Sequence, residues 1–140
     1  MKFYKVVMFE DEFIPATDLA KKLEEIGYEV LEMFASAEKG LDYLEKMKGT
    51  ESFPDAVLLD IALKGKLNGI EAARIITDQY GCGVVFLSAL SMLSVIEDAI
   101  GERAYPFLFK PFDPYQVHIG LQMAVRISEL EKEVRELSSR

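Results

Sequence analysis

The chain has 140 residues, half of them hydrophobic and 29% charged, a composition that indicates one globular domain with a hydrophobic core. Its formal net charge of -8 disfavours direct binding to nucleic acid or to an anionic membrane, because the phosphates of both would repel it. The single cysteine, Cys82, excludes a disulfide within the chain and fits a reducing compartment. No apolar run is long enough to span a membrane or resembles a secretory signal, so we expect a soluble cytoplasmic protein.

Short apolar runs alternate with longer amphipathic segments five times along the chain. In chain order we expect strands at residues 6–9, 28–34, 55–61, 83–87 and 107–109, and helices at residues 15–26, 37–48, 70–80, 92–99 and 114 to about 138. No hairpin signal separates consecutive strands, so we predict parallel strands joined by right-handed helical crossovers. The predicted fold class is therefore α/β, a doubly wound five-stranded parallel sheet with helices on both faces.

Residues that favour helix ends support these bounds. Pro15 suits the first turn of the first helix, and Gly27 and Gly49 are expected just after the first and second helices. Ser36 and Ser91 are the predicted N-caps of the second and fourth helices.

The run at residues 55–61 carries Asp60 to the carboxyl end of a strand whose four apolar residues indicate that it is buried. Open α/β sheets bind their ligands at this end of the strands. Asp60 considered alone is compatible with three roles: a helix cap, a metal ligand or a nucleophile.

Polar side chains follow four of the five predicted strands: Glu10 and Asp11, then Asp60, Ser88 and Lys110. In a parallel sheet these strand ends share one edge, so we expect the side chains to converge. Two carboxylates about 4 Å apart repel by roughly 4 kcal/mol at an effective dielectric near 20, which favours proton uptake or a bound cation. Mg²⁺ suits such a site, and Asp60 then becomes a candidate nucleophile toward phosphorus, with Ser88 and Lys110 as candidates for holding the phosphoryl oxygens.

Five segments in this order resemble the receiver domains of two-component response regulators, over residues 1 to about 122. They are Phe9-Glu10-Asp11-Glu12, Leu58-Leu59-Asp60-Ile61, Asn68-Gly69-Ile70-Glu71, Phe86-Leu87-Ser88-Ala89 and Phe109-Lys110-Pro111-Phe112. The resemblance implies a flavodoxin-like (βα)5 receiver domain at residues 1–122 with strand order 2-1-3-4-5. Residues 123–140 would then be a C-terminal extension of the last helix.

The resemblance also implies roles for the acidic residues. Asp60 corresponds to the phosphoacceptor and also to a ligand of Mg²⁺. Glu10 and Asp11 correspond to the acid pair that holds the metal, Asp11 as the more direct ligand. The backbone carbonyl of Ala62 corresponds to a further ligand.

The remaining motif residues correspond to a phosphoryl-binding pair and a switch. Ser88 and Lys110 are expected to contact the phosphoryl group, and the Lys110-Pro111 bond is expected to be cis. Ser88 and Phe107 occupy the switch positions of the family, although Phe107 is also compatible with a plain core role.

The chain departs from the family pattern in two ways. The loop between Asp60 and Gly69 is one residue longer than in many receivers. Ala62 lies two residues beyond Asp60, and Leu90 two residues beyond Ser88. Both are apolar, whereas the family often carries polar side chains at these positions that help orient the hydrolytic water. We therefore hypothesise that the phosphorylated form loses its phosphoryl group slowly.

The last predicted helix would be about 37 Å long, roughly twice what a receiver needs to cover its sheet. Its second half carries Ile127, Leu130, Val134 and Leu137 at the 3-4-3 spacing of a coiled-coil seam. We expect a coiled-coil linker that dimerises or transmits a signal; the alternative is a helix that folds back on its own domain. Two heptads are short, so a homodimer would also need the receiver surface.

The leading interpretation is a phosphoacceptor receiver that takes a phosphoryl group from a histidine kinase or phosphotransfer protein and switches a protein-binding surface. It would catalyse at most its own phosphorylation and dephosphorylation. One alternative is a Mg²⁺-dependent phosphohydrolase with an aspartyl nucleophile, in which a second acid is expected at the position of Ala62. The other is a receiver-like interaction module that works without phosphorylation.

Overall fold

The computed structural model describes residues 3–63, 65–101 and 103–139, and of residues 99 and 100 it describes the backbone alone. Five strands form one sheet: β1 (Lys5–Phe9), β2 (Glu29–Phe34), β3 (Ala56–Asp60), β4 (Gly83–Ala89) and β5 (Phe107–Lys110). Their order is β2-β1-β3-β4-β5, and every neighbouring pair is parallel. The predicted doubly wound fold and the strand order that the resemblance implies are both confirmed.

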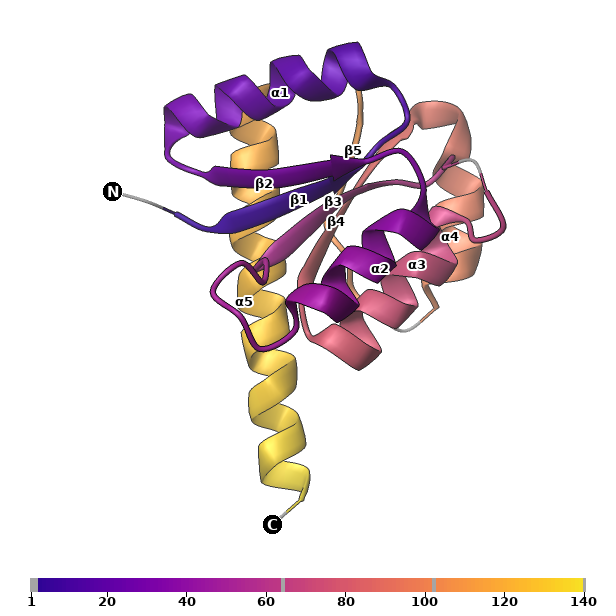
Figure 1. Cartoon of the computed structure of the whole chain (residues 1–140). Helices are drawn as coiled ribbons and strands as arrows, with labels where there is room; N and C mark the ends of the chain where they lie inside the picture. The colour runs from indigo at the N-terminus through magenta and orange to yellow at the C-terminus, as the bar shows by residue number, and fades with distance from the viewer. Residues whose placement is uncertain (1–2, 64, 102, 140) are drawn as a thin grey trace.

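Helices cover both faces of the sheet (Figure 1). They are α1 (Phe13–Ile26), α2 (Ala37–Met47), α3 (Gly69–Ile75), α4 (Leu93–Ile100) and α5 (Pro114–Ser138), with a π-helical turn η1 (Ile76–Tyr80) and a 3₁₀ turn η2 (Leu90–Met92). α1 and α5 lie on one face, and α2, α3 and α4 lie on the other.

The central strands are buried on both sides and divide their side chains between two cores. In β3, Val57 and Leu59 join the core under α2, α3 and α4, whereas Ala56 and Leu58 join the core under α1 and α5. Alternate residues thus point to opposite faces, and both faces are apolar. This is why the strand appears in the sequence as an unbroken apolar run that ends at Asp60.

The helix ends agree with the sequence signals at most positions. Pro15 lies in the first turn of α1, which begins two residues earlier than predicted, at Phe13. The Ser36 Oγ accepts a hydrogen bond from the Lys39 N–H at 3.3 Å, so the predicted cap of α2 is confirmed. α5 begins at Pro114 and continues to Ser138, as predicted.

One expectation about helix ends was wrong, and the third helix, present over the predicted residues, has a turn of unexpected type. Ser91 does not cap α4; it lies inside the 3₁₀ turn η2, whose last bond runs from the Leu93 N–H to the Leu90 carbonyl, and Met92 is the N-cap residue. The third helix is α-helical only to Ile75 and then widens into the π-helical turn η1, which ends at Gly81 with φ +66°. Among the described residues, no helix combines the length and the apolar character needed to cross a bilayer.

Candidate functional site

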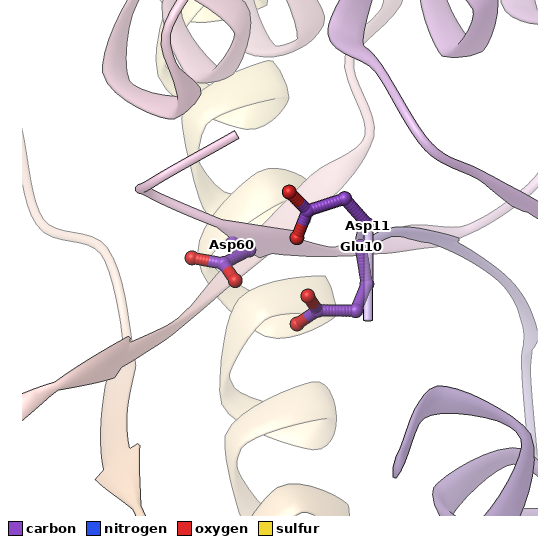
Figure 2. Close-up of side chains that lie close together, drawn as sticks. All are labelled: Glu10, Asp11 and Asp60. Carbon is purple, nitrogen blue, oxygen red and sulfur yellow. The ribbon is translucent and has the colours of Figure 1, made fainter. Parts of the chain in front are cut away.

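The acidic residues lie where β1 and β3 end side by side. Phe9 pairs with Leu59 in the parallel register, so Glu10 and Asp11 leave β1 next to Asp60, the last residue of β3. Figure 2 shows the three carboxylates close together, with those of Glu10 and Asp11 extending toward Asp60. One carboxylate oxygen from each of the three lies within 4.8 Å of the others. The predicted convergence of these acids is therefore confirmed.

Two of the three acids are buried. Glu10 is 8% exposed and Asp60 6% exposed, whereas Asp11 is half-buried. Backbone N–H groups orient the buried pair: the Ala62 N–H donates to Asp60 Oδ1 at 2.9 Å, and the Glu12 N–H donates to Glu10 Oε1 at 3.0 Å. Each carboxylate thus has one oxygen fixed by the backbone directly after its strand.

Lys110, at the end of β5, supplies the positive charge of the site. Its Nζ lies 3.3 Å from Asp60 Oδ2 and 3.2 Å from Glu10 Oε2. Burial alone would lower the pKa of Lys110, but the charges of Asp60 and Glu10 and the hydrogen bonds to them outweigh burial and raise it. The lysine therefore stays protonated between the two carboxylates.

One lysine does not compensate all the negative charge. Burial raises the pKa of Glu10 to about 7, and the negative charge of Asp60 and a hydrogen bond with it also raise it. The hydrogen bond from the Glu12 N–H and the positive charge of Lys110 lower this pKa but do not cancel the increase. Three carboxylates around one point, with a buried acid that resists ionisation, are a donor set that fits a hard divalent cation.

Of the other predicted site residues, Ser88 and Ala62 lie at the same edge of the sheet, whereas Phe107 is the first residue of β5, three residues before Lys110. Ser88 is buried near the end of β4, and its Oγ donates to the Ala89 carbonyl at 3.3 Å. Phe107 is 36% exposed on β5, and its ring packs against Phe109 with centroids 5.4 Å apart. Ala62 is exposed in the loop after β3, and the Lys110-Pro111 bond is cis, as the resemblance implies.

Two structural features at the site were not predicted from the sequence. Asn68 and Glu71 form a reciprocal capping box at the start of α3, a pattern that the Asn-Gly-Ile-Glu segment does encode. Glu38 of α2 holds the loop after β3, because its Oε1 accepts from the N–H groups of Lys66 at 2.7 Å and Leu67 at 3.0 Å. No local signal reveals this second contact, since the partners are far apart in the sequence.

Comparison with known proteins identifies the family. The family model described as the response regulator receiver domain matches residues 6–122. This chain belongs to the response-regulator receiver family. Such receivers are signalling domains of two-component systems, and a phosphoacceptor role is general among them.

Two curated relatives illustrate the similarity of this receiver to others. It is 31% identical over 140 residues to the transcriptional regulatory protein PdtaR of Mycobacterium tuberculosis (strain CDC 1551 / Oshkosh), covering 97% of this chain and 65% of PdtaR. It is 30% identical over 123 residues to the chemotaxis protein CheY of Listeria monocytogenes, covering 87% of this chain and 98% of CheY. The receiver thus spans less than two thirds of PdtaR but nearly all of CheY.

A solved structure agrees with the fold. The signal receiver domain of a modulated diguanylate cyclase from Desulfovibrio desulfuricans G20 superposes with a TM-score of 0.80 at 26% identity, over 93% of this receiver and 99% of that chain.

Proposed function

We propose that this receiver accepts a phosphoryl group on Asp60 from a histidine kinase or a phosphotransfer protein. Glu10, Asp11, Asp60 and the backbone carbonyl of Ala62 would hold Mg²⁺ for this reaction. Ser88 and Lys110 would bind the phosphoryl oxygens.

The observation that carries the proposal is the position of Asp60. Its carboxylate lies 3.3 Å from Lys110 Nζ, which also contacts Glu10, and has a carboxylate oxygen of Glu10 and of Asp11 within 4.8 Å. A carboxylate between an ammonium and a cation-binding acid pair suits an attack on phosphorus, because both positive charges stabilise the charge on the transferred group. A carboxylate that only caps a helix needs neither.

The residues present fit Mg²⁺ by their chemistry. Mg²⁺ prefers one or two carboxylates together with waters and phosphate oxygens, and these three acids lie close enough to supply them. When bound, the ion would neutralise the acid cluster and attract the oxygens of the incoming phosphoryl group.

In the transfer step the phosphoryl group moves from a phosphohistidine of the donor protein to Asp60. An Asp60 carboxylate oxygen forms a bond to phosphorus while the bond from phosphorus to the phosphohistidine nitrogen breaks. The imidazole leaves with the electron pair of that bond and takes up a proton from solvent. Lys110 gives up its contact with the Asp60 carboxylate for one with the new phosphoryl oxygens, and the Ser88 hydroxyl turns from the Ala89 carbonyl toward the same group.

Movement of Ser88 connects the site to the surface formed by α4 and β5. Phe107 lies on the strand that pairs with β4, two residues before Phe109, the partner of Ser88 in the register. We propose that phosphorylation biases Ser88 and Phe107 between two arrangements, and that this surface is what partner proteins recognise.

One experiment tests the phosphoacceptor role. The protein is incubated with Mg²⁺ and acetyl phosphate, and its intact mass is measured beside an Asp60→Asn variant. We expect a gain of one phosphoryl group in the native protein and none in the variant. An Asp11→Asn variant should show a strongly reduced gain, because the metal site is weakened while Asp60 remains.

Other outcomes would contradict the proposal. Release of phosphate without a mass gain, even in rapidly quenched samples, would indicate a phosphohydrolase. No mass gain and no phosphate release would indicate an interaction module that works without phosphorylation.

A further inference from the structure

The C-terminal half of α5 carries an apolar stripe that the described part of the receiver leaves largely exposed. Leu130, Val134 and Leu137 are 42%, 61% and 66% exposed, and Ile127 precedes them half-buried. Figure 1 shows this end of α5, drawn in yellow, extending away from the sheet and from the other helices. A helix that folded back on its own domain would bury these residues. The structure therefore supports the extended alternative.

The stripe continues onto the part of α5 that belongs to the receiver. Met123 and Ile119, 53% and 57% exposed, lie one and two turns before Ile127 on the same side of the helix. They line a surface groove of about 430 Å³ with Phe107 and Phe109 of β5. One apolar surface thus runs along α5 from the receiver to the end of the extension.

This apolar surface is separate from the side of α5 that covers the sheet. The residues packed on the sheet are Val117, Leu121, Ala124 and Val125. At about 100° of rotation per residue, the centre of the stripe lies about 150° around the helix from the centre of these four. A second helix on the stripe would therefore lie on the side of α5 away from the sheet, with Arg103 and Ala104 at its border beside Ile127, Leu130 and Val134.

The residue types in the stripe select a partner. The 3-4-3 spacing assigns Ile127 and Val134 to the a positions and Leu130 and Leu137 to the d positions of a heptad repeat. β-Branched residues at a with leucine at d favour a parallel two-stranded coiled coil. The stripe is thus suited to a second copy of itself in the same orientation.

The charges beside the seam agree with that orientation. Arg126 precedes an a position and Glu131 follows a d position, so in a parallel pair each Arg126 lies opposite Glu131 of the partner subunit. The next flanking pair is Glu133 with Ser138, which introduces no like-charge repulsion. The new contact would compete with existing ion pairs: Arg126 bonds to Glu129 at 3.2 Å, between two exposed side chains, and Glu131 lies 3.7 Å from Arg103 and 3.8 Å from Arg135. The two contacts of Glu131 are long, so they leave room for a closer one to Arg126 of the partner subunit.

We propose that this receiver forms a parallel homodimer through α5, with Ile127, Leu130, Val134 and Leu137 at a coiled-coil seam that Ile119 and Met123 extend onto the receiver. Two heptads alone are marginal in water, so the receiver part of the stripe contributes necessary apolar area. We expect a dissociation constant of about 1–100 µM. The proposal does not depend on phosphorylation of Asp60.

The first test measures oligomeric state by sedimentation equilibrium on the full chain. We expect the native protein to dimerise as its concentration rises, and a Leu130→Glu, Val134→Glu variant to stay monomeric. Glutamate is a good helix former, so circular dichroism should show unchanged helix content in that variant. The matched control is Ile14→Glu on α1, which is 82% exposed and outside the stripe, and it should dimerise like the native protein.

The second test measures orientation by disulfide cross-linking in a Cys82→Ala background. Residues at equivalent a positions face each other across a parallel seam, so Val134→Cys should form a disulfide-linked dimer under mild oxidation. Glu136→Cys, two residues on and pointing away from the seam, should not.

Three results would overturn the proposal. The first is a native protein that is monomeric up to about 500 µM, far above the expected dissociation constant. The second is a dimer that the Leu130→Glu, Val134→Glu variant retains. The third is cross-linking that does not distinguish Val134→Cys from Glu136→Cys, which would exclude a parallel seam.

Discussion

Lys110 has two opposing effects on the reaction proposed for Asp60. Its ammonium, 3.3 Å from Asp60 Oδ2, attracts phosphoryl oxygens but repels a cation bound by the same carboxylate. We therefore predict that Lys110→Ala slows phosphorylation by acetyl phosphate about tenfold or more. The same change should tighten Mg²⁺ binding by roughly fivefold, which corresponds to about 1 kcal/mol of relieved charge repulsion.

Isothermal titration calorimetry with Mg²⁺ and intact-mass kinetics measure the two effects separately. Lys110→Arg is the control, because it keeps the charge and should leave Mg²⁺ affinity close to that of the native protein. If Lys110→Ala weakened Mg²⁺ binding, the lysine would be organising the metal site and this account of its charge would be wrong.

Cys82 provides a pH-dependent measure of core burial. Burial raises the pKa of its thiol to about 12, with opposition from the Lys132 charge, whereas in the unfolded chain the thiol ionises near its ordinary value of 9.0. A raised pKa in the folded state means that the stabilisation from the neutral thiol is complete below pH 9 and is lost as the pH rises toward 12. Near pH 10.5 the loss should be about 2 kcal/mol.

Urea unfolding at pH 8 and near pH 10.5 tests this, with Cys82→Ala compared with the native protein at each pH. The other titrating groups are the same in both proteins. Between pH 8 and pH 10.5 the native protein should therefore lose about 2 kcal/mol more unfolding free energy than Cys82→Ala does. A difference that stays constant with pH would mean that Cys82 is less buried than the structure indicates.

At the scale of residues, the sequence predicts which acids meet but not how each side chain is bonded. Glu10, Asp11 and Asp60 follow strands whose ends must share one edge, so their proximity follows from topology alone. The direction of the Ser88 hydroxyl depends on a rotation about one bond, which no sequence pattern encodes. The roles of these residues in catalysis and metal binding remain predictions.

At the scale of elements, Gly69 connects α3 to the strand that carries Asp60. A Cβ on Gly69 would lie 2.5 Å from the Asp60 carbonyl oxygen and 2.6 Å from the Ile61 Cα. Gly69→Ala must therefore push α3 away from the end of β3, and we predict a loss of about 1–3 kcal/mol in unfolding free energy. Phosphorylation of Asp60 should also slow about tenfold or more, because the carboxylate is displaced.

Gly120, in the N-terminal half of α5, is the matched control for this substitution. A Cβ there would meet Val85 Cγ1 at 3.4 Å, an ordinary contact, so Gly120→Ala should stabilise the protein by about 0.5–1 kcal/mol. Urea unfolding and acetyl phosphate kinetics on both variants give the comparison. Equal effects of the two substitutions would show that the contact between Gly69 and Asp60 does not constrain the site.

Helix ends show where local signals are sufficient. Ser36 was predicted correctly because a side-chain cap needs only the residues of the next turn. Ser91 has the same residue type but lies in a 3₁₀ turn, because β4 continues to Ala89 and leaves only a short turn before α4. The π-helical turn η1 likewise reflects tertiary contacts: Thr77 Oγ1 accepts from Arg103 Nη1 at 2.6 Å, which no helical periodicity predicts.

At the scale of the whole molecule, alternating strands and helices were sufficient to predict a parallel sheet covered on both faces. They do not determine which strands are neighbours. The burial of β1, β3 and β4 on both sides fits central positions. In β2 no residue is fully buried: Glu29 and Glu32 are exposed and the other four are half-buried, as in an edge strand. The order 2-1-3-4-5 followed from the resemblance to receivers.

The lifetime of the phosphorylated state is also a property of the whole molecule, because it sets how long Ser88 and Phe107 stay in the arrangement that phosphorylation favours. Ala62 and Leu90 are exposed beside the ends of β3 and β4, and neither carries a polar group that could orient a water toward phosphorus. We predict a half-life of about 10 minutes or longer at 25 °C, which corresponds to a barrier of about 21 kcal/mol. Ala62→Asn should shorten it about tenfold, since one well-placed hydrogen bond to the water lowers the barrier by about 1.4 kcal/mol.

Loss of the phosphoryl group is followed by intact mass after removal of acetyl phosphate. Ala104→Asn, three residues before the start of β5 and far along the chain from Lys110 at its other end, introduces the same amide on an exposed site and should leave the decay unchanged. Decay of the native protein within seconds would mean that water reaches the phosphoryl group without help from either position.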